Sequence, residues 1–169
     1  KVINQLINAG VDIIKLKAGR SLEDIYSNIE LISTYLEINS IGDKLIESIR
    51  AQKQNLNQLI KSLDYEPKLL FILGHGGVAR VAGKNTADDS IIELSGAKND
   101  YEDFSGYKPV SPEQFVLFDP DFILTTSMGI DAKGGIDKFS KMPGIRDTAA
   151  VKNGNILIFD AQYLSLIHI

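Results

Sequence analysis

Residues 69–86 read Leu69-Leu-Phe-Ile-Leu-Gly-His-Gly-Gly-Val-Ala-Arg-Val-Ala-Gly-Lys-Asn-Thr86, and this stretch decides the fold. Its apolar start, residues 69–73, ends at Gly74, which predicts a short buried strand. The glycines on both sides of His75 let the backbone turn sharply and approach a ligand closely. The stretch therefore predicts a histidine on a glycine-rich loop at the carboxyl end of a strand, the edge at which open α/β sheets bind ligands.

Composition excludes several classes of function. The chain has 169 residues, of which 44% are hydrophobic and 24% charged, and this is typical of a globular domain. A net charge of -4 without a basic block argues against a nucleic-acid partner. No apolar run reaches membrane-spanning length. Because there is no cysteine, disulfides, thiolate metal sites and cysteine nucleophiles are excluded.

The two ends of the sequence look cut. The chain starts at Lys1 inside an amphipathic pattern, and residues 164–169 stop in the middle of another. These last six residues resemble a translated sequencing adapter, so we expect a non-native tail there and leave His168 out of the functional reasoning.

The first third of the chain predicts helices around one strand. Residues 1–9 indicate a helix ending at Gly10, and residues 11–16 indicate a strand. Ser21 with Asp24 forms a capping signal that starts a helix through residue 36. Asn39-Ser40 breaks the pattern, and a long helix follows over residues 41–63. That helix is apolar at both ends and polar between, which favours a strut bridging two lobes over an ordinary amphipathic helix on one sheet.

The remainder alternates strands with helices. Helices are expected at 87–95 and from Ser111-Pro-Glu113, and strands at 122–126 and 156–159. Residues 97–107 indicate a polar loop. Alternation of this kind predicts a mostly parallel sheet.

Several chemical interpretations of the glycine loop compete. Gly74–Ala79 fits the G-x-G-x-x-A pattern, which would make the protein a nucleotide-binding α/β enzyme, but that fingerprint needs a helix at the turn. Serine hydrolysis is disfavoured because no G-x-S-x-G is present and His75 is the one histidine left to serve as a base. On chemistry alone, His75 is either a loop residue bonding the backbone or a ligand to iron carried by another molecule.

Eight short motifs together resemble the haem (hemin) substrate-binding proteins of bacterial ABC importers, part of a wider family that also carries cobalamin and ferric siderophores. In order they are Leu73-Gly-His-Gly-Gly77, Val81-Ala-Gly-Lys-Asn-Thr-Ala-Asp88, Gly106-Tyr-Lys-Pro109, Ser111-Pro-Glu-Gln114, Asp119-Pro-Asp-Phe-Ile123, Gly134-Gly135, Met142-Pro-Gly144 and Asp147-Thr-Ala149. The combination of Gly-His-Gly-Gly with Ala-Gly-x-x-Thr-Ala is more typical of the haem branch.

The resemblance implies an α/β, two-lobed periplasmic binding protein in which a single long helix joins the lobes and the ligand lies in the cleft between them. On that pattern residues 1–38 are a remnant of the N-terminal lobe, 39–65 the interlobe helix and 66–163 the C-terminal α/β lobe. It further implies a monomer without catalysis, located in the periplasm or held at the cell surface as a lipoprotein. Such a protein meets the membrane through the importer's permease.

The resemblance also assigns site residues. His75 matches a cleft position that ligates iron in some members, and Gly74, Gly76 and Gly77 share its loop. Cleft-rim contacts are expected from Tyr107 and Met128. The principal iron ligand of many members, a tyrosine of the N-terminal lobe, would precede Lys1 and is not assigned.

Glu113 matches the glutamate that such proteins present to arginines of the permease, a pairing that gives a strong and oriented contact. We therefore expect capture of haem and its delivery to a permease. The alternatives are a ferric siderophore or cobalamin on the same fold, the nucleotide-binding enzyme, and a lobe without a ligand. Because only neutral imidazole ligates iron, binding through His75 should weaken below roughly pH 6.

Overall fold

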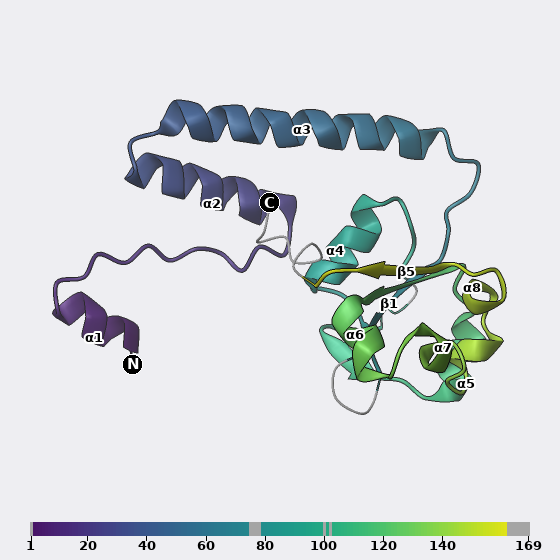
Figure 1. The fold of residues 1–169 in the computed structure, drawn as a ribbon. Helices are drawn as coiled ribbons and strands as arrows, with labels where there is room; N and C mark the ends of the chain where they lie inside the picture. Colours follow the sequence, from purple (N-terminus) through teal and green to yellow (C-terminus); the bar gives the residue numbers. More distant parts are fainter. Residues whose placement is uncertain (1, 75–78, 100, 102, 162–169) are drawn as a thin grey trace.

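The computed structural model describes residues 2–74, 79–99, 101 and 103–161. Three helices come first: α1 (Val2–Asn8), α2 (Leu22–Tyr35) and α3 (Asn39–Lys61). An α/β lobe follows and contains the described strands, as Figure 1 shows. Its strands are β1 (Leu69–Leu73), β2 (Arg80–Ala82), β3 (Tyr107–Pro109), β4 (Phe122–Thr126) and β5 (Ile156–Phe159). Its helices are α4 (Ala87–Leu94), α5 (Pro112–Phe118), α6 (Ser127–Ala132), α7 (Ile136–Phe139), the 3₁₀ turn η1 (Ile145–Asp147) and α8 (Ala149–Lys152).

The five strands form one mixed sheet in the order β3-β2-β1-β4-β5. β1 pairs in parallel with β4, and β4 with β5, whereas β2 is antiparallel to both β1 and β3. The expectation of a mostly parallel sheet is therefore wrong for half of the strand pairs. The reason is the short connection from β1 to β2, because a parallel return needs a crossover of a dozen or more residues.

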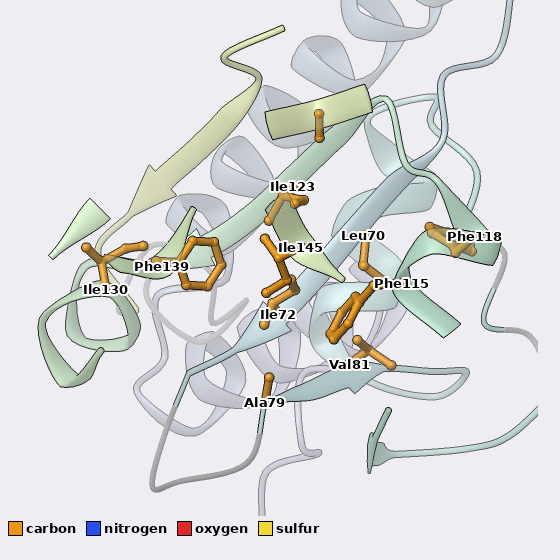
Figure 2. Packing of buried hydrophobic residues seen from close by; sticks show 11 residues of the cluster. Leu70, Ile72, Ala79, Val81, Phe115, Phe118, Ile123, Ile130, Phe139 and Ile145 are labelled. Carbon is orange, nitrogen blue, oxygen red and sulfur yellow. The ribbon is translucent and has the colours of Figure 1, made fainter. Parts of the chain in front are cut away.

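The centre of the sheet, β1 and β4, is buried on both faces. Along β1, Leu70 and Ile72 point to the face that α5, α6, α7, η1 and α8 cover, and both side chains are fully buried. Figure 2 shows this cluster over β1, with Phe115 from α5, Phe139 from α7 and Ile145 from η1. The opposite face carries Leu69 and Phe71 and is covered by α4 through Ile92. This two-sided burial explains why the strand is an unbroken apolar run.

Helices α2 and α3 pack against each other, as Figure 1 shows. Their contact depends on Gly42 of α3, since a Cβ there would lie 2.4 Å from Ser33 Oγ of α2. The predicted cap of α2 is confirmed, with Ser21 accepting from the Asp24 backbone N–H. The predicted break at residues 39–40 is wrong, because both residues lie in the first turn of α3. Most of α3 is exposed, and within it only Gly42 and Ile46 are buried.

Two local predictions fail for reasons of pairing. Residues 11–16, expected as a strand, adopt no regular structure, and Val11, Ile13 and Leu16 are exposed. Among the described residues no strand lies beside this segment, and an extended segment without a neighbour has no partner for its backbone hydrogen bonds. Conversely, β3 falls at the end of the expected loop. It is a short, exposed edge strand in which Pro109 is tolerated.

Candidate functional site

The carboxyl ends of β1 and β4 meet at one edge of the sheet. Gly74 follows β1, and β4 ends at Thr126, the N-cap of α6. Here the backbone of Gly74 lies directly against Gly129 of α6. A Cβ on Gly74 would lie 2.6 Å from Gly129 Cα and 2.7 Å from its carbonyl oxygen. Any side chain at position 74 would force this contact apart, so the glycine ties the start of the His75 loop to α6.

Two threonines at the end of β4 hold the same edge. The Thr125 hydroxyl donates to the Ile72 carbonyl at 2.8 Å, and the Thr126 hydroxyl oxygen accepts from the Gly129 N–H at 3.0 Å. Both threonines are buried, so these hydrogen bonds form out of contact with water. The sequence reasoning missed them, although two adjacent threonines closing an apolar strand before a glycine are a recognisable cap signal.

Met128 is the second residue of α6, beside Gly129. Its side chain is 52% exposed, so the thioether is open to a ligand or to water at this edge. The prediction that residues 127–129 leave β4 at the edge where β1 ends is confirmed by the parallel register of the two strands. Direct contact of Met128 with a ligand stays a prediction.

Tyr107 lies elsewhere. In the sheet, Tyr107 pairs with Ala82 of β2. The strand residue level with the end of β1 is Pro109, because Pro109 pairs with Arg80 and Arg80 pairs with Leu73. Tyr107 is thus set back from the edge and stands two strands from β1, roughly 10 Å away. The structure does not bring it beside Gly74 or Met128, and its contact with a ligand stays a prediction.

The Tyr107 hydroxyl donates a short hydrogen bond to the carboxylate of Asp88, in the first turn of α4. Burial raises the pKa of the Asp88 carboxyl, and the hydrogen bond from Tyr107 offsets part of that rise. Burial and the neighbouring Asp88 raise the pKa of Tyr107 well above its usual range. This pair joins the edge strand β3 to α4.

A buried polar network holds the start of α4. Thr86, its N-cap, accepts from the Asp89 N–H at 3.0 Å, and Asn99 donates to the Asp89 carboxylate at 2.8 Å. Asn99 also donates to the Ala82 carbonyl of β2 at 3.2 Å. The Thr86 cap was predicted from the sequence, but the part played by Asn99 was not, because it comes from a distant loop.

Glu113 lies on the other face of the sheet, in the first turn of α5. This helix has a complete capping box, in which Ser111 Oγ accepts from the Gln114 N–H and the Gln114 side chain accepts from the Ser111 N–H. Hydrogen bonds from the Ser111 hydroxyl and from its own backbone N–H lower the pKa of Glu113. Glu113 is therefore an exposed carboxylate that stays ionised at neutral pH.

His75, Gly76 and Gly77 lie outside the described residues, so their predicted roles remain predictions. Within the described ranges, no group of three or more histidine, aspartate or glutamate side chains is arranged to hold a metal ion. None of the helices in the described part combines the length and apolar character needed to cross a membrane. The nucleotide-binding alternative fails on geometry, because strand β2 follows the glycine loop where that fingerprint requires a helix.

Comparisons with known proteins agree on one family. The sequence pattern of the periplasmic binding proteins matches residues 3–163. The uncharacterised ABC transporter substrate-binding lipoprotein YvrC of Bacillus subtilis (strain 168) is 25% identical over 165 residues, which are 96% of this chain and 51% of YvrC. The vitamin B12-binding protein of Vibrio campbellii (strain ATCC BAA-1116) is 27% identical over 135 residues, 79% of this chain and 48% of that protein. This chain spans about half the length of these two relatives.

Among solved structures, the periplasmic heme-binding protein RhuT from Roseiflexus sp. RS-1, in its apo form, is similar to this chain at 30% sequence identity with a TM-score of 0.88. The match covers 96% of this chain and 63% of that one. The similarity therefore extends over α1 to β5 and is not confined to the glycine loop.

Proposed function

Since this chain belongs to the periplasmic binding protein family, we propose that the protein is the substrate-binding component of an ABC importer and that its cargo is haem. In this proposal the protein works in the periplasm or as a lipoprotein at the cell surface, where it captures haem and releases it to a permease. It transports its ligand without transforming it.

The observation that carries the haem assignment is the similarity to a periplasmic heme-binding protein along 96% of the chain. The sheet edge is compatible with such a cargo. Haem is flat and largely apolar, so it needs apolar walls, a few polar anchors and an axial donor. His75 would supply the donor, with Gly74, Gly76 and Gly77 allowing close approach and Met128 an exposed apolar contact.

We further propose the two-lobed organisation, with residues 1–38 in the N-terminal lobe, 39–65 as the interlobe helix and 66–163 as the C-terminal lobe. Exposed apolar side chains on the first helices support this, because an N-terminal lobe would cover them. They are Val2, Ile3, Leu6 and Ile7 of α1, Val11, Ile13 and Leu16 of the following segment, and Leu31, Ile32 and Tyr35 of α2.

Glu113 is proposed to dock the permease. The strand register supports this role. Pro109, the last residue of β3, lies level with Leu73 at the sheet edge where β1 ends, and the chain passes from there into α5. A carboxylate at the start of α5 would therefore meet a partner seated over the end of the lobe from which cargo is released. An arginine of the permease would supply the opposite charge.

Cobalamin is the second candidate cargo, supported by the 27% identity to a vitamin B12-binding protein. Calorimetric titration of the full-length protein with hemin, cyanocobalamin and a ferric hydroxamate siderophore separates the candidates. Saturable binding of hemin alone is the expected result. Binding of cyanocobalamin or the siderophore without hemin would overturn the haem assignment and leave the importer role intact.

A further inference from the structure

Helix α4 is joined to the N-terminal helices at two separate points. In its first half, the Ser90 hydroxyl donates to the Arg20 carbonyl, just before α2, at 2.5 Å. At its end, Gly96 lies so close to Ile60 of α3 that an added Cβ would meet the Ile60 Cγ2 at 2.6 Å. Figure 1 shows α4 between these helices and the sheet. We name these two contacts, Ser90 with Arg20 and Gly96 with Ile60, the α4 brace.

Between the two contacts the helices meet across a cavity. It has a volume of about 270 Å³ and is bounded by the start of α2, the middle of α3 and one side of α4. Polar side chains line much of it, among them Lys53 and Asn57 of α3 and Glu93 of α4. A polar cavity of this size accommodates water, so α2 and α3 can shift across it without breaking a packed apolar core.

The two contacts of the brace differ in kind. Gly96 against Ile60 is a close steric contact, and the φ of +77° at Gly96 suits glycine and strains other residues. The bond from Ser90 joins residues 70 positions apart in the sequence, and it can open without disturbing the backbone of either helix. Two separated contacts fix an angle, whereas Gly96 and Ile60 alone would form a pivot. Ser90 therefore decides whether α2 and α3 can rock relative to the sheet.

Resting on the proposed two-lobed importer protein, we propose that the α4 brace sets the angle between the lobes and thereby the width of the ligand cleft. In that organisation α2 and the segment before it belong to the N-terminal lobe, while α4 packs on the C-terminal sheet through Ile92. With the bond from Ser90 made, the lobes keep one spacing. When the bond opens, the lobes rock about Gly96 and Ile60, the cleft widens and the cargo leaves.

The first test measures the spacing of the lobes in the full-length protein without ligand. Spin labels are attached at Glu30→Cys on α2 and Lys141→Cys in the α/β lobe, both exposed positions. The 169 residues contain no cysteine, and any elsewhere in the full-length protein is replaced by serine. Double electron–electron resonance then gives the distance distribution between the labels. Ser90→Ala should broaden it. Ser95→Ala is the matched control and should not, because the Ser95 hydroxyl bonds to the Ile92 carbonyl within α4.

The second test measures release of the proposed cargo. The unlabelled wild type, Ser90→Ala and Ser95→Ala are loaded with hemin, and its transfer to excess apomyoglobin gives the dissociation rate. Losing one exposed hydrogen bond between the lobes should speed dissociation from Ser90→Ala roughly two- to fivefold. Ser95→Ala should release hemin at the wild-type rate.

Each outcome bears on a different step. An unchanged distance distribution for Ser90→Ala overturns the α4 brace. Equal broadening by Ser95→Ala overturns it as well, since a weakened α4 would then be the cause. Broadening by Ser90→Ala with an unchanged dissociation rate overturns the control of release. If the wild type does not bind hemin, the proposed cargo fails, while the distributions measured without ligand still decide the brace.

Discussion

At the scale of single residues, the sheet edge at which β1 and β4 end depends on two glycines from separate elements. Gly74 ends β1 and Gly129 belongs to α6, and their backbones touch because neither carries a side chain. An added Cβ at position 74 would meet backbone atoms, which cannot rotate away. At position 129 it would meet Thr126 Oγ1 at 3.1 Å and the Gly74 nitrogen at 3.2 Å, a tight contact that small shifts can relieve.

We therefore expect Gly74→Ala to be the more damaging of two matched substitutions. It should lower the free energy of unfolding by roughly 1–3 kcal/mol through overpacking, and Gly129→Ala should cost less. Thermal unfolding followed by circular dichroism measures both. The Gly74 variant should also bind hemin less tightly, because the start of the His75 loop would move. An unchanged midpoint of thermal unfolding for Gly74→Ala would contradict the close contact between Gly74 and Gly129.

The candidate site could be anticipated from the sequence only where its signals are local. The capping roles of Ser21, Thr86 and Ser111 were predicted, because each cap is formed with a residue three positions along the chain. The contact between Gly74 and Gly129 could not be predicted, since it depends on how β1 and β4 align.

At the scale of elements, the edge strand β3 is held to α4 by the bond from Tyr107 to Asp88. Because burial raises the pKa of Asp88, its contribution to stability is fully present below the unfolded pKa and is lost as pH rises through the folded value. The ionised form of Asp88 is therefore disfavoured in the fold, and the hydrogen bond from Tyr107 reduces this cost but does not remove it.

Asp88→Asn tests this directly, since the amide keeps an acceptor for Tyr107 and cannot ionise. Relative to this variant, the wild type should lose thermal stability as the pH rises from about 4 to about 8. Melting curves across that range measure the difference, with the exposed Asp103→Asn as control. A difference between wild type and Asp88→Asn that stays constant with pH would contradict the assigned pKa shift.

Whether an element was predicted follows from where its stabilising partners lie. Strands β1 and β4 were predicted from their apolar runs, because burial on both faces leaves a clear pattern in the chain. β5 was also predicted from its apolar run, although most of this strand is exposed. Residues 11–16 have the same local pattern but no neighbouring strand among the described residues, so they do not form one. β3 escaped prediction because its stability comes from pairing with β2 and not from its own exposed residues.

At the scale of the whole molecule, α1 and the segment up to Leu16 have little holding them in the 169-residue chain. Lys17 and Arg20, by contrast, are hydrogen-bonded to α2 and α4. No residue of α1 is buried, and most of residues 9–20 are exposed. Trypsin should therefore cut first after Lys15 in this chain, before it cuts within the α/β lobe. In the full-length protein an N-terminal lobe should cover the same segment and slow this cleavage tenfold or more. A tenfold slowing corresponds to a free energy of local opening of about 1.4 kcal/mol.

Mass spectrometry of timed digests would identify the cut sites. A matched reference is cleavage after Lys152, at the end of α8 in the lobe, which should proceed at the same rate in both proteins. Equal rates of cleavage after Lys15 in the 169-residue chain and in the full-length protein would contradict the two-lobed organisation.

The central proposal is that the protein captures haem at the sheet edge where β1 ends, with His75 as a ligand to the iron. It is tested most directly by titrating the full-length protein and its His75→Ala variant with hemin and following the Soret band. We predict a saturating shift for the wild type that weakens below roughly pH 6, where imidazole becomes protonated. The variant should give a different spectrum and lose that pH dependence. A wild type without any Soret shift would contradict the haem assignment, and identical spectra would remove His75 from the iron.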